Sequence, residues 1–155
     1  MTQATEALVV DASVAAKWHL PDEEYSELAS ILLTRFAEGR TNLIAPSYIR
    51  FEVPNAITVA TQGRNPRITQ EQGRDAIEEF LAIPLTTLDS NDIILVAYSL
   101  VNIYGCALYD AFYLAVSQQL GIPFITADGR LFRRISHLPS VVWIGDYSPP
   151  DNSLL

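Results

Sequence analysis

The chain has 155 residues, of which 49% are hydrophobic and 18% charged, so it is long and apolar enough for one domain with a sizeable core. Its net charge of −8 argues against broad, nonspecific binding to nucleic acid, which depends on basic side chains. A single cysteine, Cys106, excludes an internal disulfide and a cysteine-based zinc site. We expect one globular domain over residues 1–155, with loose tails at 1–6 and 148–155.

The order of apolar runs, helical spacings and turn residues predicts alternating strands and helices. Strands are expected at residues 7–11, 43–45, 85–88, 124–126 and 141–144, and helices at 13–19, 24–38, 47–62, 69–82, 90–104, 110–120 and 129–135. Pro54 predicts a kink at residues 50–54, and Thr69 with Gln72 predicts a capping box. The alternation indicates the α/β class, as a three-layer α/β/α sandwich around a central, mostly parallel sheet.

Neither a membrane span nor a secretory signal is expected. The longest uncharged run, residues 93–109, contains Ser99 and Asn102 and is flanked by Asp92 and Asp110. Residues 1–7 contain no basic residue and lead into only a short apolar run. Together with the single cysteine, these features make the cytoplasm the expected location.

Two short apolar runs that predict strands, residues 8–10 and 124–127, each stop on an aspartate, Asp11 in the first case and Asp128 in the second. Parallel α/β sheets bind ligands just beyond the carboxyl ends of their strands. Glu52 and Asp110, between these strands in the sequence, open or lie in predicted helices. If the two strands are neighbours, these acids meet at one edge of the sheet and form a candidate active site.

Each of these acids also has a purely structural explanation. Asp11, Asp110 and Asp128 all stand where an aspartate commonly caps a helix. Glu52 is compatible with an exposed helix face, although Asn55, three residues further on, shares that face and is placed to orient the carboxylate.

Convergence of the acids would favour the functional explanation. Two carboxylates about 4 Å apart repel by roughly 4 kcal/mol at an effective dielectric near 20. Such a cluster requires protons or a hard divalent cation, and an all-oxygen site suits Mg²⁺ or Mn²⁺. Ser13 and Thr126 add hydroxyl groups beside two of the acids.

Four segments of the sequence, in this order, resemble the PIN domain, and most closely the VapC toxins of bacterial toxin–antitoxin pairs. They are VVDASVAAKW at residues 9–18, residues 46–56 with EVPNA, YDAFYLA at 109–115, and ITAD at 125–128. The match extends from about residue 8 to 145. It assigns the four acidic positions of the family, catalytic and metal-binding, to Asp11, Glu52, Asp110 and Asp128, and its supporting polar positions to Ser13, Asn55 and Thr126.

This resemblance implies a Mg²⁺- or Mn²⁺-dependent endoribonuclease that cleaves RNA, forms a homodimer and is held inactive by a VapB-type antitoxin. Two alternatives keep the PIN fold: a noncatalytic partner-binding domain, and an RNA-processing nuclease without an antitoxin. An aspartyl-phosphate protein is disfavoured, because phosphatases of that type resemble Asp-x-Asp after the first strand, whereas Ala12 and Ser13 follow Asp11 here.

Two surface features are also open to more than one interpretation. An antitoxin groove and plain core packing both explain the apolar residues Trp18, Leu20, Tyr25, Leu28 and Leu32. Phosphate-binding patches and ordinary solvated surface both explain the arginine groups Arg64, Arg67 and Arg74, and Arg130, Arg133 and Arg134.

Overall fold

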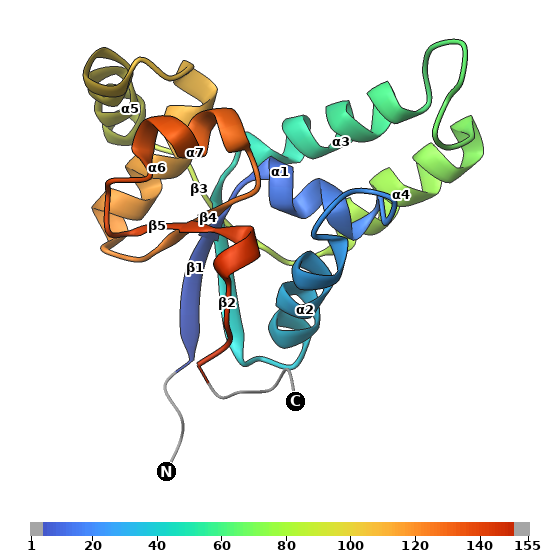
Figure 1. The fold of residues 1–155 in the computed structure, drawn as a ribbon, viewed down its shortest axis with the longest axis horizontal. Helices are drawn as coiled ribbons and strands as arrows, with labels where there is room; N and C mark the ends of the chain where they lie inside the picture. Colours follow the sequence, from blue (N-terminus) through green and yellow to red (C-terminus); the bar gives the residue numbers. More distant parts are fainter. Residues whose placement is uncertain (1–4, 151–155) are drawn as a thin grey trace.

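The computed structural model describes residues 5–150 and contains a five-stranded sheet in which every pairing is parallel (Figure 1). The strand order is β3-β2-β1-β4-β5. The strands are β1 Glu6–Val10, β2 Thr41–Pro46, β3 Thr86–Leu88, β4 Phe124–Thr126 and β5 Val141–Trp143. β1 and β4 are direct neighbours, with Val9 opposite Phe124 and Val10 opposite Ile125. The residues that follow these two strands are therefore brought side by side.

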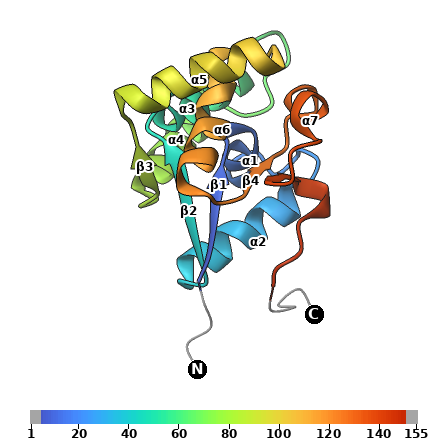
Figure 2. The ribbon, with the colours of Figure 1, turned by 90° about the vertical axis from the view of Figure 1, so that its left-hand side faces the viewer.

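Helices cover both faces of the sheet, which confirms the predicted three-layer α/β/α sandwich (Figure 2). They are α1 Ala12–Ala15, α2 Ser26–Ala37, α3 Ile49–Ala60, α4 Gln70–Ala82, α5 Asn91–Tyr104, α6 Leu108–Leu120 and α7 Gly129–Ile135, with 3₁₀ turns η1 Ala16–Trp18 and η2 Ile144–Asp146. α6 packs on β1, β2 and β4 and carries α5 on its outer side, whereas α1 and α2 cover the opposite face. α3 and α4 form a helical pair that extends away from the sheet (Figure 1).

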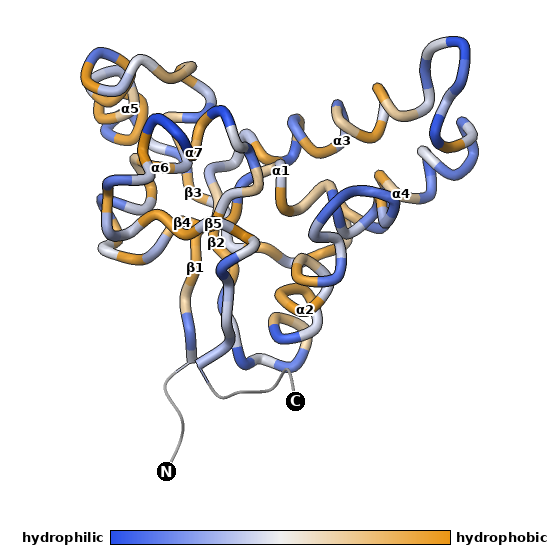
Figure 3. Tube along the Cα trace, viewed as in Figure 1, coloured by the Kyte–Doolittle hydropathy of each residue, from blue (hydrophilic) through white to orange (hydrophobic). Residues whose placement is uncertain are grey.

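The central strands are buried on both faces. Val9, Val10, Phe124 and Ile125 are all 0% exposed, as expected for parallel strands that run between two helical layers. Figure 3 shows this pattern, with hydrophobic residues along β1 and β4 and hydrophilic ones at the loop between α3 and α4. Burial of these continuous apolar runs fixes the strands that carry the candidate acids.

Several helix boundaries differ from the prediction for local reasons. The first helix is only one turn long before it tightens into η1. α2 begins at Ser26, because Tyr25 adopts a left-handed backbone conformation with φ of 63°. α6 begins at Leu108, so Asp110 lies within the first turn and is not the cap. The capping box of Thr69 and Gln72 is confirmed.

Two further predictions concern Pro54 and the chain ends. α3 continues through Pro54, and the kink predicted there stays a prediction. The predicted loose N-terminal tail is wrong at Glu6, which begins β1 and whose carboxylate accepts hydrogen bonds from Thr41 and Tyr147, each at 2.9 Å. The first bond joins β1 to β2, and the second joins β1 to the segment after η2. Residues 1–4 and 151–155 of the predicted tails lie outside the described residues.

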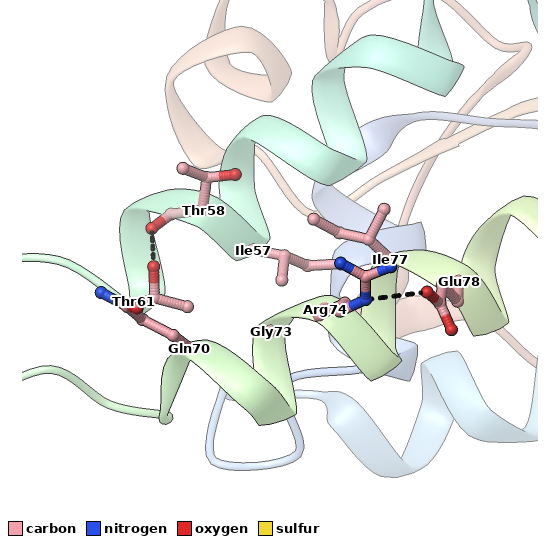
Figure 4. Close-up of a pocket in the computed structure, with 8 residues that line it drawn as sticks. All are labelled: Ile57, Thr58, Thr61, Gln70, Gly73, Arg74, Ile77 and Glu78. Carbon is pink, nitrogen blue, oxygen red and sulfur yellow. Dashed lines mark hydrogen bonds and ion pairs between the residues drawn. The ribbon is translucent and has the colours of Figure 1, made fainter.

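The helical pair α3–α4 is closely packed at Gly73. A Cβ atom added there would lie 2.5 Å from Thr61 Cγ2, so this position requires glycine or a shift of the neighbouring side chain. Figure 4 shows the pocket beside this contact, where Ile57 and Ile77 lie near the ion pair of Arg74 with Glu78. None of the predicted site residues lines this pocket.

The residues of the predicted apolar groove belong mostly to the core. Leu20 and Leu32 are 1% and 0% exposed. Trp18 donates its indole N–H to the Ala29 carbonyl at 2.8 Å, and Tyr25 contacts Trp143 edge to face. Core packing therefore explains this set of residues, as the alternative interpretation expected.

No single helix within residues 5–150 is both long and apolar enough to cross a membrane. α5 and α6 satisfy the criteria of length and composition only as a pair, and the two are bent by 112° with respect to each other.

Candidate active site

Asp11 lies directly after β1 and is held by three hydrogen bonds. Its Oδ1 accepts from the Ser13 hydroxyl and from the Val14 backbone N–H at 3.1 Å, and its Oδ2 accepts from the Thr126 hydroxyl at the end of β4. The Val14 bond caps α1, so the structural and the functional explanations apply to the same side chain.

The hydroxyls of Ser13 and Thr126 connect Asp11 to the chain that follows β4. Ser13 Oγ accepts the Ala127 N–H at 2.9 Å, and Thr126 Oγ1 accepts the Asp128 N–H at 3.1 Å. Each hydroxyl thus donates to Asp11 and accepts from a backbone N–H of the segment that follows β4. This network fixes the relative positions of the two strand-end aspartates.

Burial raises the pKa of Asp11 to about 6. The Asp11 side chain loses hydration, because the residue is only 4% exposed, and the nearby charge of Asp128 adds to the effect. The bonds from Ser13, Thr126 and Val14 stabilise the charged form and oppose the shift. The ionised carboxylate is therefore less stabilised here than it would be in water.

Glu52 lies on α3 and points toward the same region. The Tyr113 hydroxyl, on α6, donates a hydrogen bond to Glu52 Oε1 at 3.1 Å. Burial raises the pKa of Glu52 to about 7, the bond from Tyr113 opposes this rise, and repulsion from Asp11 and Asp110 increases it. Glu52 is therefore electrostatically coupled to two of the other predicted acids.

Asp110 and Asp128 complete the group. The pKa of Asp110 is raised by burial and by the charge of Asp128. Asp128 caps α7, with Oδ1 accepting from the N–H groups of Arg130 at 2.9 Å and Leu131 at 3.1 Å. Electrostatic repulsion acts between Asp110 and Asp128, between Asp128 and Asp11, and between Glu52 and both Asp11 and Asp110. We refer to these four residues as the acidic cluster.

The donor set of the acidic cluster suits a hard divalent cation, since it consists of carboxylate oxygens whose charges are incompletely compensated. Among the described residues, no three His, Cys, Asp or Glu side chains are arranged so that they could hold a metal ion together as they lie. Mg²⁺, however, is often held by one or two carboxylates and keeps several waters. The chemistry of the site thus fits such an ion.

The structure separates the predicted supporting residues into two kinds. Ser13 and Thr126 bond directly to Asp11, whereas Asn55 is exposed and does not bond to Glu52 within residues 5–150. Tyr113 takes that place, although sequence reasoning did not single it out. One signal was available, because Tyr113 stands between the apolar residues Phe112 and Leu114, and a buried tyrosine usually finds a partner for its hydroxyl.

The two arginine groups also differ. Arg67 forms ion pairs with Asp22 at 2.7 Å and Glu23 at 3.4 Å, and Arg74 pairs with Glu78 at 3.1 Å. The second group, on α7 immediately after Asp128, consists of the exposed side chains Arg130, Arg133 and Arg134, for which no ion pair is present in the described part of the chain. Positive charge that is free to contact a phosphate therefore lies next to the acidic cluster.

These observations define the class of protein as a three-layer α/β sandwich with an acidic cluster at the carboxyl edge of its sheet. A family model for the PIN domain matches residues 8–138, and the chain belongs to this family. It is 30% identical over 130 residues to Ribonuclease VapC12 of Mycobacterium tuberculosis, a match that covers 84% of this chain and 93% of the relative.

Solved structures with the same fold extend the comparison. The Pyrobaculum aerophilum protein PAE2754 has a TM-score of 0.61 and 18% identity, over 92% of this chain and 93% of that one. VapBC2 from Rickettsia felis, bound to a DNA fragment from its promoter, has a TM-score of 0.59 and 12% identity, over 88% and 96%. VapC20 of Mycobacterium tuberculosis, a Sarcin-Ricin loop cleaving toxin, has a TM-score of 0.57 and 16% identity, over 79% and 90%. At these identities the likeness concerns the fold.

Proposed function

We propose that this chain is a Mg²⁺- or Mn²⁺-dependent endoribonuclease that hydrolyses RNA as the toxin of a VapBC-type toxin–antitoxin pair. The observation that carries the proposal is the acidic cluster at the carboxyl edge of the sheet in a chain of the PIN family. The ribonuclease name of the 30% identical relative supports the choice of RNA as substrate.

In this proposal Asp11 and Asp128 are the principal cation ligands, and Glu52 and Asp110 bind the cation or orient the attacking water. The chemistry that a bound divalent cation supplies at such a site is activation of a water and neutralisation of charge on the phosphate. Asp11 Oδ1 already accepts two hydrogen bonds and Oδ2 accepts one. Because a carboxylate oxygen has two acceptor positions, the free one on Asp11 lies on Oδ2.

The proposed partners follow from the same family assignment. A VapB-type antitoxin would hold the enzyme inactive, and the enzyme would be a homodimer that works in the cytoplasm, where its RNA substrates are found. Support for an antitoxin comes from solved structures of the same fold, which include a toxin–antitoxin complex from Klebsiella pneumoniae and VapBC2 from Rickettsia felis.

The test compares the wild-type chain with Asp11→Asn and with Asp75→Asn. Both changes remove one negative charge, but Asp75 is exposed on α4, remote from the acidic cluster. We expect the wild type and Asp75→Asn to cleave a labelled RNA in Mg²⁺ or Mn²⁺, and to stop when the cation is chelated. Asp11→Asn should be folded, as judged by circular dichroism and thermal unfolding, and inactive. Cleavage by Asp11→Asn at the wild-type rate would contradict the proposal.

A further inference from the structure

Four aromatic side chains form a contiguous group beside the acidic cluster. Tyr48 precedes α3 and stacks on Tyr109 of α6, with ring centroids 4.3 Å apart and planes inclined by 11°. Phe51 lies 6.2 Å from Tyr48, and Phe112 lies 6.3 Å from Tyr48 and 5.8 Å from Tyr109. We call these four residues the aromatic cluster. It connects the beginning of α3 to the beginning of α6, the two helices that carry Glu52 and Asp110.

The aromatic cluster is placed for contact with a ligand more than for packing. Phe51 is 70% exposed and Tyr109 is 52% exposed, so both rings present much of their surface to water. Each directly precedes an acid of the acidic cluster in the chain, Glu52 and Asp110 respectively. Contiguous exposed apolar surface at such a place commonly marks a binding site.

A pocket joins the two clusters. Its volume is about 410 Å³, and its lining includes Ser13, Tyr48, Phe51, Glu52 and Asn55. The lining therefore combines two rings of the aromatic cluster, Tyr48 and Phe51, with Glu52 of the acidic cluster and with the Ser13 hydroxyl that bonds to Asp11. A group that occupies this pocket touches the rings and the reacting region at the same time.

The chemistry of the pocket matches an unpaired nucleobase. Aromatic side chains stack on bases of any sequence, because every base has a π-face. The Asn55 side chain is exposed, and within residues 5–150 no hydrogen bond to another residue occupies it. Its amide offers both a donor and an acceptor to the edge of a base.

We propose that the aromatic cluster, together with Asn55, forms a subsite that stacks an unpaired base of the RNA next to the phosphate that is cleaved. This inference rests on the proposed ribonuclease function and specifies that the substrate is single-stranded or looped at this position. Phe51 provides the exposed ring surface in the pocket, and Asn55 reads the edge of the base. Tyr109 extends the aromatic surface outside the pocket through its stack on Tyr48.

The test measures RNA binding separately from cleavage. The Asp11→Asn protein is used throughout, so that a short fluorescent single-stranded RNA stays intact during titration. Phe51→Ala is introduced in this background, with Val59→Ala as the matched control, because Val59 is 60% exposed on the same helix. Phe51→Tyr keeps a ring at the position.

We expect Phe51→Ala to weaken RNA binding by roughly 5- to 150-fold, which corresponds to the loss of one stacked base. Phe51→Tyr and Val59→Ala should bind as the background protein does. A set of RNAs, each lacking the base at a different position, is then bound to the background protein and to its Phe51→Ala variant. For one abasic position the two proteins should have the same affinity, because the stacked base is missing. Equal RNA binding by Phe51→Ala and Val59→Ala would overturn the subsite.

Two other outcomes are distinguishable from this one. If Phe51→Ala leaves RNA binding unchanged but weakens self-association in sedimentation experiments, the aromatic cluster is a protein interface and the subsite is overturned. If Asp11→Asn cleaves RNA as the wild type does, the proposed function fails, whereas the binding comparison at Phe51 fails or succeeds without any reference to cleavage.

Discussion

The hydroxyl of Thr126 donates a hydrogen bond to Asp11 Oδ2 across two neighbouring parallel strands, although the two residues are 115 positions apart in the chain. The same hydroxyl accepts the backbone N–H of Asp128. Thr126 is 0% exposed, so water cannot replace either interaction. A single side chain thus sets the position of two members of the acidic cluster, and we regard it as a positioning residue.

Thr126→Val should therefore impair both stability and activity. Valine has nearly the same shape but leaves Asp11 Oδ2 and the Asp128 N–H without this partner, at a cost of roughly 1–3 kcal/mol in the free energy of unfolding. The bond from Thr126 lowers the Asp11 pKa in the wild type, so the Asp11 pKa should be higher in the variant. Protons should then compete more strongly with a cation for the Asp11 carboxylate. Urea unfolding and the ratio of cleavage rates at about pH 6 and pH 8 measure the two effects.

Thr126→Ser is the control for this change, because it keeps the hydroxyl and removes only the methyl group. Its rate ratio should be that of the wild type, even if unfolding becomes somewhat easier. Identical ratios for the valine and serine variants would show that the hydroxyl does not act through Asp11.

Tyr113→Phe should change the titration of Glu52 with little effect on packing. The Tyr113 ring stacks on Phe124 with centroids 6.1 Å apart, and phenylalanine preserves that contact. The lost hydroxyl bond is the interaction that lowers the Glu52 pKa, so that pKa should rise above about 7. We expect cleavage to decrease most below neutral pH, with stability changed by about 1 kcal/mol.

A suitable control for Tyr113→Phe is Tyr147→Phe. Tyr147 is 7% exposed and donates its hydroxyl hydrogen to Glu6, far from the acidic cluster. It should lose comparable stability and keep the wild-type pH–rate profile. If both variants shift the profile equally, the effect of Tyr113 is general and does not depend on Glu52.

The stability of the metal-free protein should decrease as pH rises. Burial raises the pKa of Asp11 from 3.8 to about 6 and that of Glu52 from 4.5 to about 7, so the folded protein binds more protons than the unfolded chain in this window. Their stabilising contribution is complete below about pH 4 and is lost as pH rises through 6 and 7. For Asp11, which is almost fully buried, the loss is about 3 kcal/mol at about 1.4 kcal/mol per pKa unit.

Thermal unfolding between about pH 5 and pH 8 checks this expectation. The decrease in Tm should be smaller in Asp11→Asn than in the wild type, because the variant has no carboxyl to ionise at that position. Added Mn²⁺ should raise the Tm of the wild type more at about pH 8 than at about pH 5, since only ionised carboxylates bind the cation. A Tm that changes with pH equally in both proteins would exclude Asp11 as the source.

Local sequence patterns predicted the sheet and the identity of the acidic positions. The strands at Asp11 and Asp128 are short apolar runs that are buried on both faces, and such runs are recognisable without a structure. Their adjacency was an assumption, because the pairing of β1 with β4 depends on contacts between distant parts of the chain. The predicted start of α6 at Asp110 was wrong, because Ala107 caps the helix without a side-chain hydrogen bond and so leaves no signal in the sequence. Asp110 therefore lies inside the helix.

The partners of the acids could be predicted only in part. Ser13 and Thr126 stand next to strand ends, so their positions follow from the strands. Tyr113 reaches Glu52 from a different helix, 61 positions away, and that contact depends on how α6 packs on the sheet. Likewise, helical spacing placed Leu32 on the apolar face of its helix but did not show whether that face lines a groove or packs in the core, where Leu32 lies.

Arg130 and Arg133 should contact phosphates of the RNA. The chain has a net charge of −8, so few other positive side chains can do so. Both are exposed on α7 beside Asp128, and no ion pair engages them within residues 5–150. In the Asp11→Asn background, Arg130→Gln and Arg133→Gln should weaken binding of single-stranded RNA. Each lost phosphate contact should reduce the slope of log affinity against log salt by about 0.7. Arg74→Gln is the control, because that arginine is already paired with Glu78. If all three variants have the same affinity and salt slope, RNA does not approach the acidic cluster over α7.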